Sequence, residues 1–215
     1  MYNNSYRRNS AANNNQNNGT GYVRVFHTVP NAPNVDIYAN DNKIVENLAY
    51  GEYTDYLSVP EGTYQISLYV TGTNTPVLSN MLMVNRNSIK TVAAVGTLNT
   101  IGFLAIPDAN TPMKMGSSML RFSHLSPNAP AVDIVLPDGT PLFRNVSFKQ
   151  LTDYVAVPPG NYTVIVRLAG TTTDVLTVPN LNLGANNYYT AYAIGLVGET
   201  PSLEAMLLTD NIQLM

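Results

Sequence analysis

The chain has 215 residues and a formal net charge of −3; 45% of its residues are hydrophobic and only 12% are charged. This hydrophobic content suffices for buried cores, and the charge balance excludes an electrostatic affinity for nucleic acid or an anionic membrane. The absence of cysteine excludes disulfides, thiolate catalysis and cysteine-ligated zinc. No apolar run approaches the roughly 18 residues of a membrane span, so we expect no membrane insertion.

The first nineteen residues differ in composition from the rest of the chain. Eight of them are asparagine, and no aliphatic side chain larger than alanine follows Met1. Such a segment buries too little apolar surface to offset the entropy lost on ordering, so we predict a disordered tail over residues 1–19. The segment also lacks the apolar stretch of a secretory signal.

After this tail the chain repeats itself, with an offset of 97 residues in the first matching block and of 98 and then 99 residues farther along. The block YVRVFHTVPNAPNVDI begins at Tyr22, and MLRFSHLSPNAPAVDI begins at Met119. A period of this length suits a whole domain rather than a solenoid unit. We therefore predict domains over 20–108 and 119–215, joined by a linker over 109–118. The recurring motif residues are His27, Pro30, Pro33 and Asp36, matched by His124, Pro127, Pro130 and Asp133.

Within each copy, short segments alternate apolar and polar residues or form brief apolar runs, and Gly, Pro, Asn or Asp interrupts them at short intervals. Gln65 to Val70 and Thr163 to Leu168 are examples. These patterns predict strands, and no stretch has the spacing of an amphipathic helix. About seven strands in each copy predict an all-β fold: two tandem immunoglobulin-like antiparallel β-sandwiches.

The run from His124 to Asp133, HLSPNAPAVD, and the later Pro-x-Gly-x-Tyr together resemble the bacterial domain-of-unknown-function family 4397. The first copy departs from this motif, since Val29 replaces the serine. The resemblance covers the chain from Gly21 onward. It implies tandem β-sandwich modules that are secreted or exposed at a surface, with no established catalytic activity.

The histidines are the obvious catalytic candidates, because imidazole titrates near neutral pH. Ser123 cannot pair with His124, because adjacent side chains of a strand point to opposite faces. Each motif histidine could meet the motif aspartate across its turn, as two metal ligands or as a buried hydrogen-bonded pair. A stable metal site needs three or four ligands, so the structural interpretation is favoured. We expect no catalytic residue, no metal and no cofactor.

Several tyrosines invite a structural or a ligand-binding interpretation. Tyr64 and Tyr162 each follow a turn glycine by two residues, which predicts a tyrosine corner whose hydroxyl binds nearby backbone. A sugar-binding platform is the alternative use of exposed tyrosines. The candidates for such a platform are Tyr50, Tyr53 and Tyr56. The second copy has Phe148 in place of Tyr50 and Leu151 in place of Tyr53, so a platform shared by both copies is only weakly supported.

These observations favour a non-enzymatic structural protein that self-assembles into a surface layer or fibre, as in a spore coat or appendage. The tail and the edge strands would link the subunits of this homo-oligomer or polymer. The alternative is a monomeric extracellular module that binds glycan or cell wall. Both hypotheses place the protein outside the cell, on a cell or spore surface.

Overall fold

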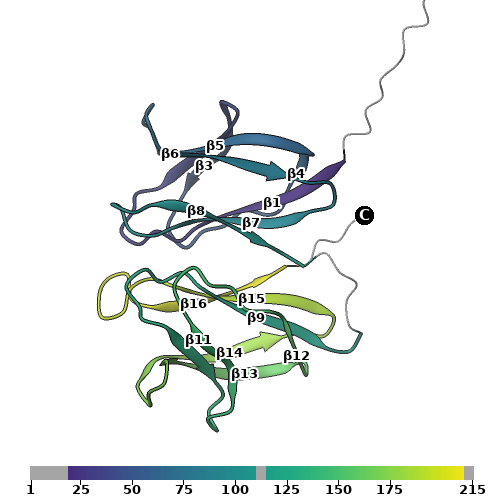
Figure 1. Cartoon of the computed structure of the whole chain (residues 1–215), viewed down its shortest axis with the longest axis vertical. Coiled ribbons are helices and arrows are strands. Elements are labelled where there is room, and N and C mark those ends of the chain that lie inside the picture. The colour runs from purple at the N-terminus through teal and green to yellow at the C-terminus, as the bar shows by residue number, and fades with distance from the viewer. Residues whose placement is uncertain (1–18, 110–114, 211–215) are drawn as a thin grey trace, which may run out of the picture.

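The computed structural model of the chain describes residues 19–109 and 115–210. All regular secondary structure in these ranges is β-strand, arranged as two sandwiches stacked along the long axis (Figure 1). Residues 1–18 of the predicted tail and 110–114 of the predicted linker lie outside the described residues. No helix in the described part is long and apolar enough to cross a membrane.

Each sandwich contains eight strands. The strands of the first are β1 (Thr20–His27), β2 (Val35–Ala39), β3 (Asn42–Leu48), β4 (Leu57–Pro60), β5 (Gly62–Val70), β6 (Pro76–Val84), β7 (Ile89–Val95) and β8 (Gly102–Pro107). The strands of the second are β9 (Ser118–His124), β10 (Val132–Val135), β11 (Pro141–Val146), β12 (Val155–Val157), β13 (Gly160–Leu168), β14 (Asp174–Leu183), β15 (Asn187–Ile194) and β16 (Glu204–Thr209).

Four four-stranded sheets build the molecule. The inner sheets, β4-β1-β7-β8 and β12-β9-β15-β16, face each other at the junction of the sandwiches, and the outer sheets, β3-β2-β5-β6 and β11-β10-β13-β14, lie at the two far ends (Figure 1). The predicted all-β tandem sandwich is therefore confirmed.

The sheets are not wholly antiparallel, however. In each inner sheet the first strand pairs in parallel with the seventh, β1 with β7 and β9 with β15. Parallel neighbours need a long crossover connection. Here the intervening strands provide it, because they carry the chain through the outer sheet and back.

The central strands of the inner sheets are nearly continuous apolar runs in the sequence, and strand β1 shows the reason. Val23 and Val25 point into the first sandwich, whereas Arg24 and Phe26 point toward the second sandwich. Both faces are thus buried, and the alternation expected for a half-buried strand disappears. A hydrophobic cluster spans the junction, with residues of both sandwiches: Phe26, Ala93, Val95, Ile106, Leu125, Tyr192, Ile194 and Leu208.

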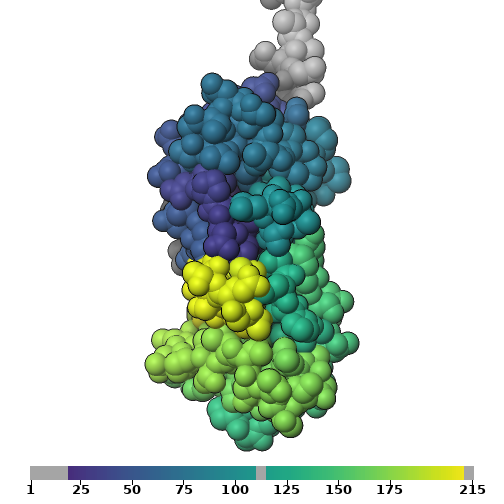
Figure 2. Space-filling model, turned by 90° about the vertical axis from the view of Figure 1, so that its left-hand side faces the viewer, coloured from purple at the N-terminus to yellow at the C-terminus, as the bar shows by residue number. Residues whose placement is uncertain are grey.

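The loops at the junction also connect the two sandwiches. In Figure 2 the purple segment near β1 lies against the yellow segment near the end of the chain. The side-chain amide of Asn31 donates a hydrogen bond of 3.0 Å to the carbonyl of Thr200 at this junction. The two sandwiches therefore form one continuous body.

Candidate functional site

The two motif histidines occupy equivalent positions, at the ends of β1 and β9, and both are fully buried. Nε2 of His27 lies 3.3 Å from the carbonyl oxygen of Pro33, and its Nδ1 accepts a hydrogen bond of 3.4 Å from the Val29 amide. Nε2 of His124 lies 3.1 Å from the carbonyl of Pro130. A neutral imidazole protonated on Nε2 satisfies these contacts, so each ring fastens the proline-rich turn that follows it.

The motif aspartate of the first copy binds the neighbouring strand and loop. The carboxylate of Asp36 accepts hydrogen bonds of 2.9 Å from the Asn47 amide and the Thr71 hydroxyl, and Lys43 Nζ lies 2.9 Å away. The hydrogen bond from Lys43, followed by that from Asn47, lowers the pKa of Asp36. Asn47 has a positive φ of 56° and lies in β3 where its pairing with β2 shifts register, so this carboxylate holds an irregular part of the strand.

Asp133 plays the same part in the second copy, accepting hydrogen bonds from the amides of Asn145, at 2.7 Å, and Gly170, at 3.3 Å. In the described ranges, no hydrogen bond joins a motif histidine to the aspartate of its own turn. No group of three or more His, Asp or Glu residues in those ranges is placed to hold a metal ion. The histidine and the aspartate of each motif therefore hold different parts of the backbone and do not pair with each other.

The motif prolines shape the turn between these two groups. Pro30 is buried and Pro127 is half-buried, whereas Pro33 and Pro130 are exposed and present their carbonyls to the buried imidazoles. The serine that the first copy lacks also has a structural contact, since the Ser126 hydroxyl donates a hydrogen bond of 2.7 Å to the Gly195 carbonyl.

The two corner tyrosines make equivalent contacts in the two copies. The hydroxyl of Tyr64 donates to the carbonyl of Pro60 at 2.8 Å, and that of Tyr162 donates to the carbonyl of Pro158 at 2.7 Å. Each contact spans four residues and closes the turn before the fifth strand of its sandwich. The predicted site residues thus make separate structural contacts; of the two corner tyrosines, Tyr64 also lines the groove of the first sandwich that is described below.

Acid is expected to destabilise the fold through the two histidines. Burial lowers the pKa of His27 and of His124 in the folded state. The unfolded chain, with histidine pKa values near 6.5, then binds more protons than the folded chain just below that pH. The free energy of unfolding therefore has its full value above about pH 6.5. On acidification below that pH it falls by up to about 1.4 kcal/mol per pH unit for each histidine. Urea unfolding at about pH 7.5, 6.5 and 5.5 measures this free energy, and equal free energies of unfolding at the three pH values would contradict the prediction.

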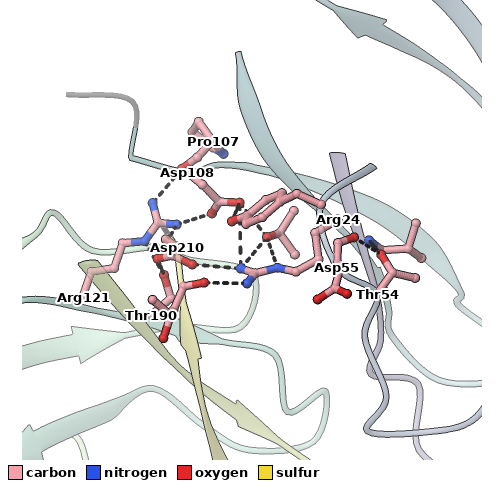
Figure 3. Close-up of polar contacts among 12 residues, drawn as sticks. Arg24, Thr54, Asp55, Pro107, Asp108, Arg121, Thr190 and Asp210 are labelled. Carbon is pink, nitrogen blue, oxygen red and sulfur yellow. Dashed lines mark hydrogen bonds and ion pairs between the residues drawn. The ribbon is translucent and has the colours of Figure 1, made fainter. Parts of the chain in front are cut away.

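A second group of polar residues, which the sequence reasoning did not single out, lies between the sandwiches (Figure 3). Arg24 of β1 and Arg121 of β9 each bind the aspartate that follows the last strand of the other sandwich. Nη2 of Arg24 lies 2.8 Å from Oδ1 of Asp210, and Nη2 of Arg121 lies 2.6 Å from Oδ1 of Asp108. We call these four residues the interdomain cluster; their side chains are at most 4% exposed.

Further hydrogen bonds hold the guanidinium groups in place. Nε and Nη2 of Arg24 donate to the Thr91 hydroxyl at 3.0 and 2.8 Å, and that hydroxyl donates to Asp108 at 2.6 Å. Nη1 of Arg24 donates to the Thr209 carbonyl at 2.9 Å. The second copy repeats the pattern with Arg121, Thr190, Asp210 and the Pro107 carbonyl.

One tyrosine of each copy covers the interdomain cluster. The Arg24 guanidinium carbon lies 4.6 Å from the ring centre of Tyr56, and that of Arg121 lies 4.4 Å from the ring of Tyr154. The Tyr56 hydroxyl donates to Asp108 at 2.8 Å. Burial, and then the nearby carboxylate of Asp210, raises the pKa of Asp108. Paired and enclosed in this way, the charges are inaccessible to a substrate, and they fix the two sandwiches to each other.

The sequence does contain a signal for this cluster. An arginine interrupts the same apolar strand in both copies, YVRVFH and MLRFSH, in a chain with few charges. An isolated charge in a buried strand needs a partner, and Asp108 and Asp210 directly follow the last strand of each copy. The sequence does not indicate, however, that each arginine pairs with the aspartate of the other sandwich.

The three tyrosines considered as a sugar platform lie at the junction instead. Tyr56 covers the interdomain cluster, and the ring of Tyr53 stands edge-on to Phe26 with the centroids 6.0 Å apart. The hydroxyl of Tyr50 donates to Glu204 of the second sandwich at 3.4 Å. Their rings are spread over three different contacts, so they do not form one platform.

A different pair of tyrosines lies on the outer face of the first sandwich. Tyr38 of β2 and Tyr69 of β5 have ring centroids 4.7 Å apart and planes tilted by 55°. Both side chains are partly exposed, and Lys43 Nζ lies 5.8 Å from the ring centre of Tyr38. Within the described residues, no hydrogen bond engages either tyrosine hydroxyl. The strand register places Val135 and Arg167 at the equivalent positions of the second sandwich.

The edge strand β6 extends this outer face with apolar side chains. Val77, Met81 and Met83 point outward and are 49%, 67% and 59% exposed. Between them and the tyrosine pair, the hydroxyls of Ser67 and Ser79 bind each other at 2.8 Å. The face therefore combines aromatic, apolar and hydroxyl groups on one outer sheet.

A groove of about 430 Å³ opens at the side of the first sandwich, between the edge strands β3 and β4. We call it the first-sandwich groove. Ala39 contributes to its lining, and the second sandwich has the larger Leu136, which packs against the core, at the equivalent position directly after β10. Other side chains that line the groove are Val23, Ile44, Leu57, Val59, Ile66 and Leu82.

The fold and the repeated motif define a tandem β-sandwich module whose two copies are fixed face to face. The profile of the domain-of-unknown-function family DUF4397 matches residues 21–135 and 134–214. The chain therefore belongs to the DUF4397 family, with two copies of its domain. Comparison with curated proteins finds no match.

Among solved structures, the chain is similar to the CBMbc module, of family CBM26, from Eubacterium rectale Amy13K in complex with maltoheptaose. The alignment covers 90% of this chain and 98% of that one, at 10% sequence identity and a TM-score of 0.29. Values this low imply neither a common ligand nor a common site.

Proposed function

We propose that the protein is a non-enzymatic glycan-binding module displayed outside the cell, and that the outer face of its first sandwich binds the glycan. The observation that carries this proposal is the pair formed by Tyr38 and Tyr69. It lies on a sheet that faces away from the second sandwich (Figure 1).

The chemistry of this face suits a sugar polymer. A sugar ring presents C–H groups on its faces and hydroxyls at its edge, and tyrosine offers an apolar ring with a polar tip that loses little entropy on binding. The tyrosine hydroxyls and the amide of Gln65, which is exposed on the same face, are available to the sugar edge. Lys43 adds a donor beside the ring of Tyr38.

The burial of the motif histidines and of the interdomain cluster supports a role without catalysis. A general acid or base must come within hydrogen-bond reach of its substrate. Both motif histidines are fully buried against backbone groups, and the interdomain cluster is enclosed by both sandwiches. The polar groups of the outer face, by contrast, are accessible and suited to recognition.

Replacing Tyr69 with alanine is expected to weaken glycan binding about tenfold or more, because truncation of an aromatic anchor typically costs over 1 kcal/mol. Pull-down on insoluble cellulose, chitin, starch and cell-wall sacculi identifies the polymer, and titration with its soluble oligosaccharide gives the affinity. The matched control is Arg167→Ala, which truncates the equivalent position of the second sandwich and leaves binding unchanged. Equal binding by the wild-type chain and both variants would contradict the proposal.

Assembly with copies of itself is a second candidate function, and one observation favours it. The first-sandwich groove is apolar and lies between two edge strands whose outer backbone groups have no strand partner in the described sheets. Edge strands of this kind accept an added strand. Assembly would build a layer or fibre on a cell or spore surface.

A further inference from the structure

We propose that the first-sandwich groove binds the N-terminal segment, residues 1–18, of a second copy of this chain as an added strand. The inference rests on the second candidate function, self-assembly, and names the surface and the segment that would produce it.

The groove has the features of a strand acceptor. Among the described residues, strand β4 pairs only with β1 and β3 pairs only with β2, so no described strand occupies their facing edges. The interior between them is apolar and unfilled, because Ala39 is short where the second sandwich has Leu136. An inserted strand would gain backbone hydrogen bonds from an edge and bury its side chains in the groove.

The N-terminal segment matches this acceptor in length, pattern and charge. Its 18 residues span up to roughly 60 Å when extended, which is enough to reach a neighbouring molecule. Tyr2 and Tyr6 fall on the same side of an extended chain, so both rings can enter one groove. Arg7 and Arg8 are its only charged residues, while the rest of the chain has nine basic and 14 acidic side chains.

The geometry favours a second copy over the same chain. The amide of Glu61 donates a hydrogen bond of 2.6 Å to the carbonyl of Gly19, so the segment enters β1 beside the end of β4. Strand β4 then lies between this entry point and the groove. The groove of a neighbour presents no such obstacle. Because groove and segment are different parts of one chain, the contact is head-to-tail and links copies into a row or a closed ring.

Two full-length variants separate donor from acceptor. Tyr2→Ser with Tyr6→Ser removes the anchors of the segment, and Ile44→Lys places a charge at the mouth of the groove, where Ile44 is 40% exposed. Ala39→Leu narrows the groove independently, with the residue that the second sandwich uses. The control is Val77→Lys, which changes another exposed apolar residue, on the edge strand β6, that does not line the groove.

Light scattering at concentrations up to the order of 100 µM is expected to show the wild type and Val77→Lys associating, while each donor or acceptor variant associates at least tenfold more weakly. An equimolar mixture of the donor-deficient and Ile44→Lys variants forms a one-to-one dimer and nothing larger. A wild type that stays monomeric overturns both self-assembly and the groove proposal. Association that persists in Ile44→Lys and Ala39→Leu overturns the groove alone, and association that survives loss of both tyrosines overturns the segment as occupant.

Discussion

Replacing Arg24 with methionine is expected to lower the free energy of unfolding by about 3–5 kcal/mol, the usual cost of breaking a buried ion pair from one side. The substitution removes the contacts to Asp210 and Thr91 and leaves the buried Asp210 without its nearest ion-pair partner. Arg121→Met is expected to cost a similar amount, because the second copy repeats the contacts. Urea unfolding followed by circular dichroism measures both changes.

The chain provides a matched control for these variants. Arg167 also pairs with an aspartate, Asp174, at 2.6 Å, but it does so on the partly exposed outer face. Arg167→Met is expected to change stability by about 1 kcal/mol or less. Similar losses in Arg24→Met and Arg167→Met would show that enclosure between the sandwiches adds nothing to the pair.

The second large effect is expected at Tyr192, which is fully buried in the cluster that spans the junction. Its ring lies edge-on to Phe26 of the first sandwich, with the centroids 5.2 Å apart. Tyr192→Ala is expected to cost about 3–5 kcal/mol, because it removes this contact and leaves a cavity that the rigid sheets cannot close. Thermal and urea unfolding of the full chain test the loss.

Tyr192→Phe is the informative counterpart. The Tyr192 hydroxyl is buried and has no hydrogen-bond partner in the described part of the chain. Its removal is therefore expected to leave stability unchanged or to raise it slightly, since no hydrogen bond is lost. A loss in Tyr192→Phe as large as that in Tyr192→Ala would mean that the hydroxyl, rather than the ring, stabilises the junction.

Much of the fold could be predicted from the sequence, because its signals are local or repeat exactly once. Strand periodicity, turn glycines and a second copy at an offset of about 97 residues together predicted two tandem sandwiches, and the structure has them. The parallel pairing of β1 with β7 could not be predicted in this way. It depends on which of two sheets each strand joins, and periodicity within a strand contains no such information.

The contacts of the site were harder to predict, since they depend on register and on backbone groups. His27 binds a carbonyl six residues away and Asp36 an amide eleven residues away, whereas sequence reasoning considered only the two side chains. Tyr38 and Tyr69 are neighbours because β2 and β5 pair in one particular register. The rings of Tyr50, Tyr53 and Tyr56 lie in the segment between β3 and β4 and contact residues at the junction, a placement that depends on packing between the sandwiches and not on the spacing of these tyrosines in the sequence.

The back-to-back inner sheets also determine what the molecule presents to its surroundings. The two outer sheets look in opposite directions (Figure 1). A molecule lying with one outer sheet flat on a polymer holds the other at maximum height above it. The two copies therefore cannot both bind the same flat surface with their outer sheets. Instead, the molecule presents two different binding faces on opposite sides, and the second face is available to a different partner.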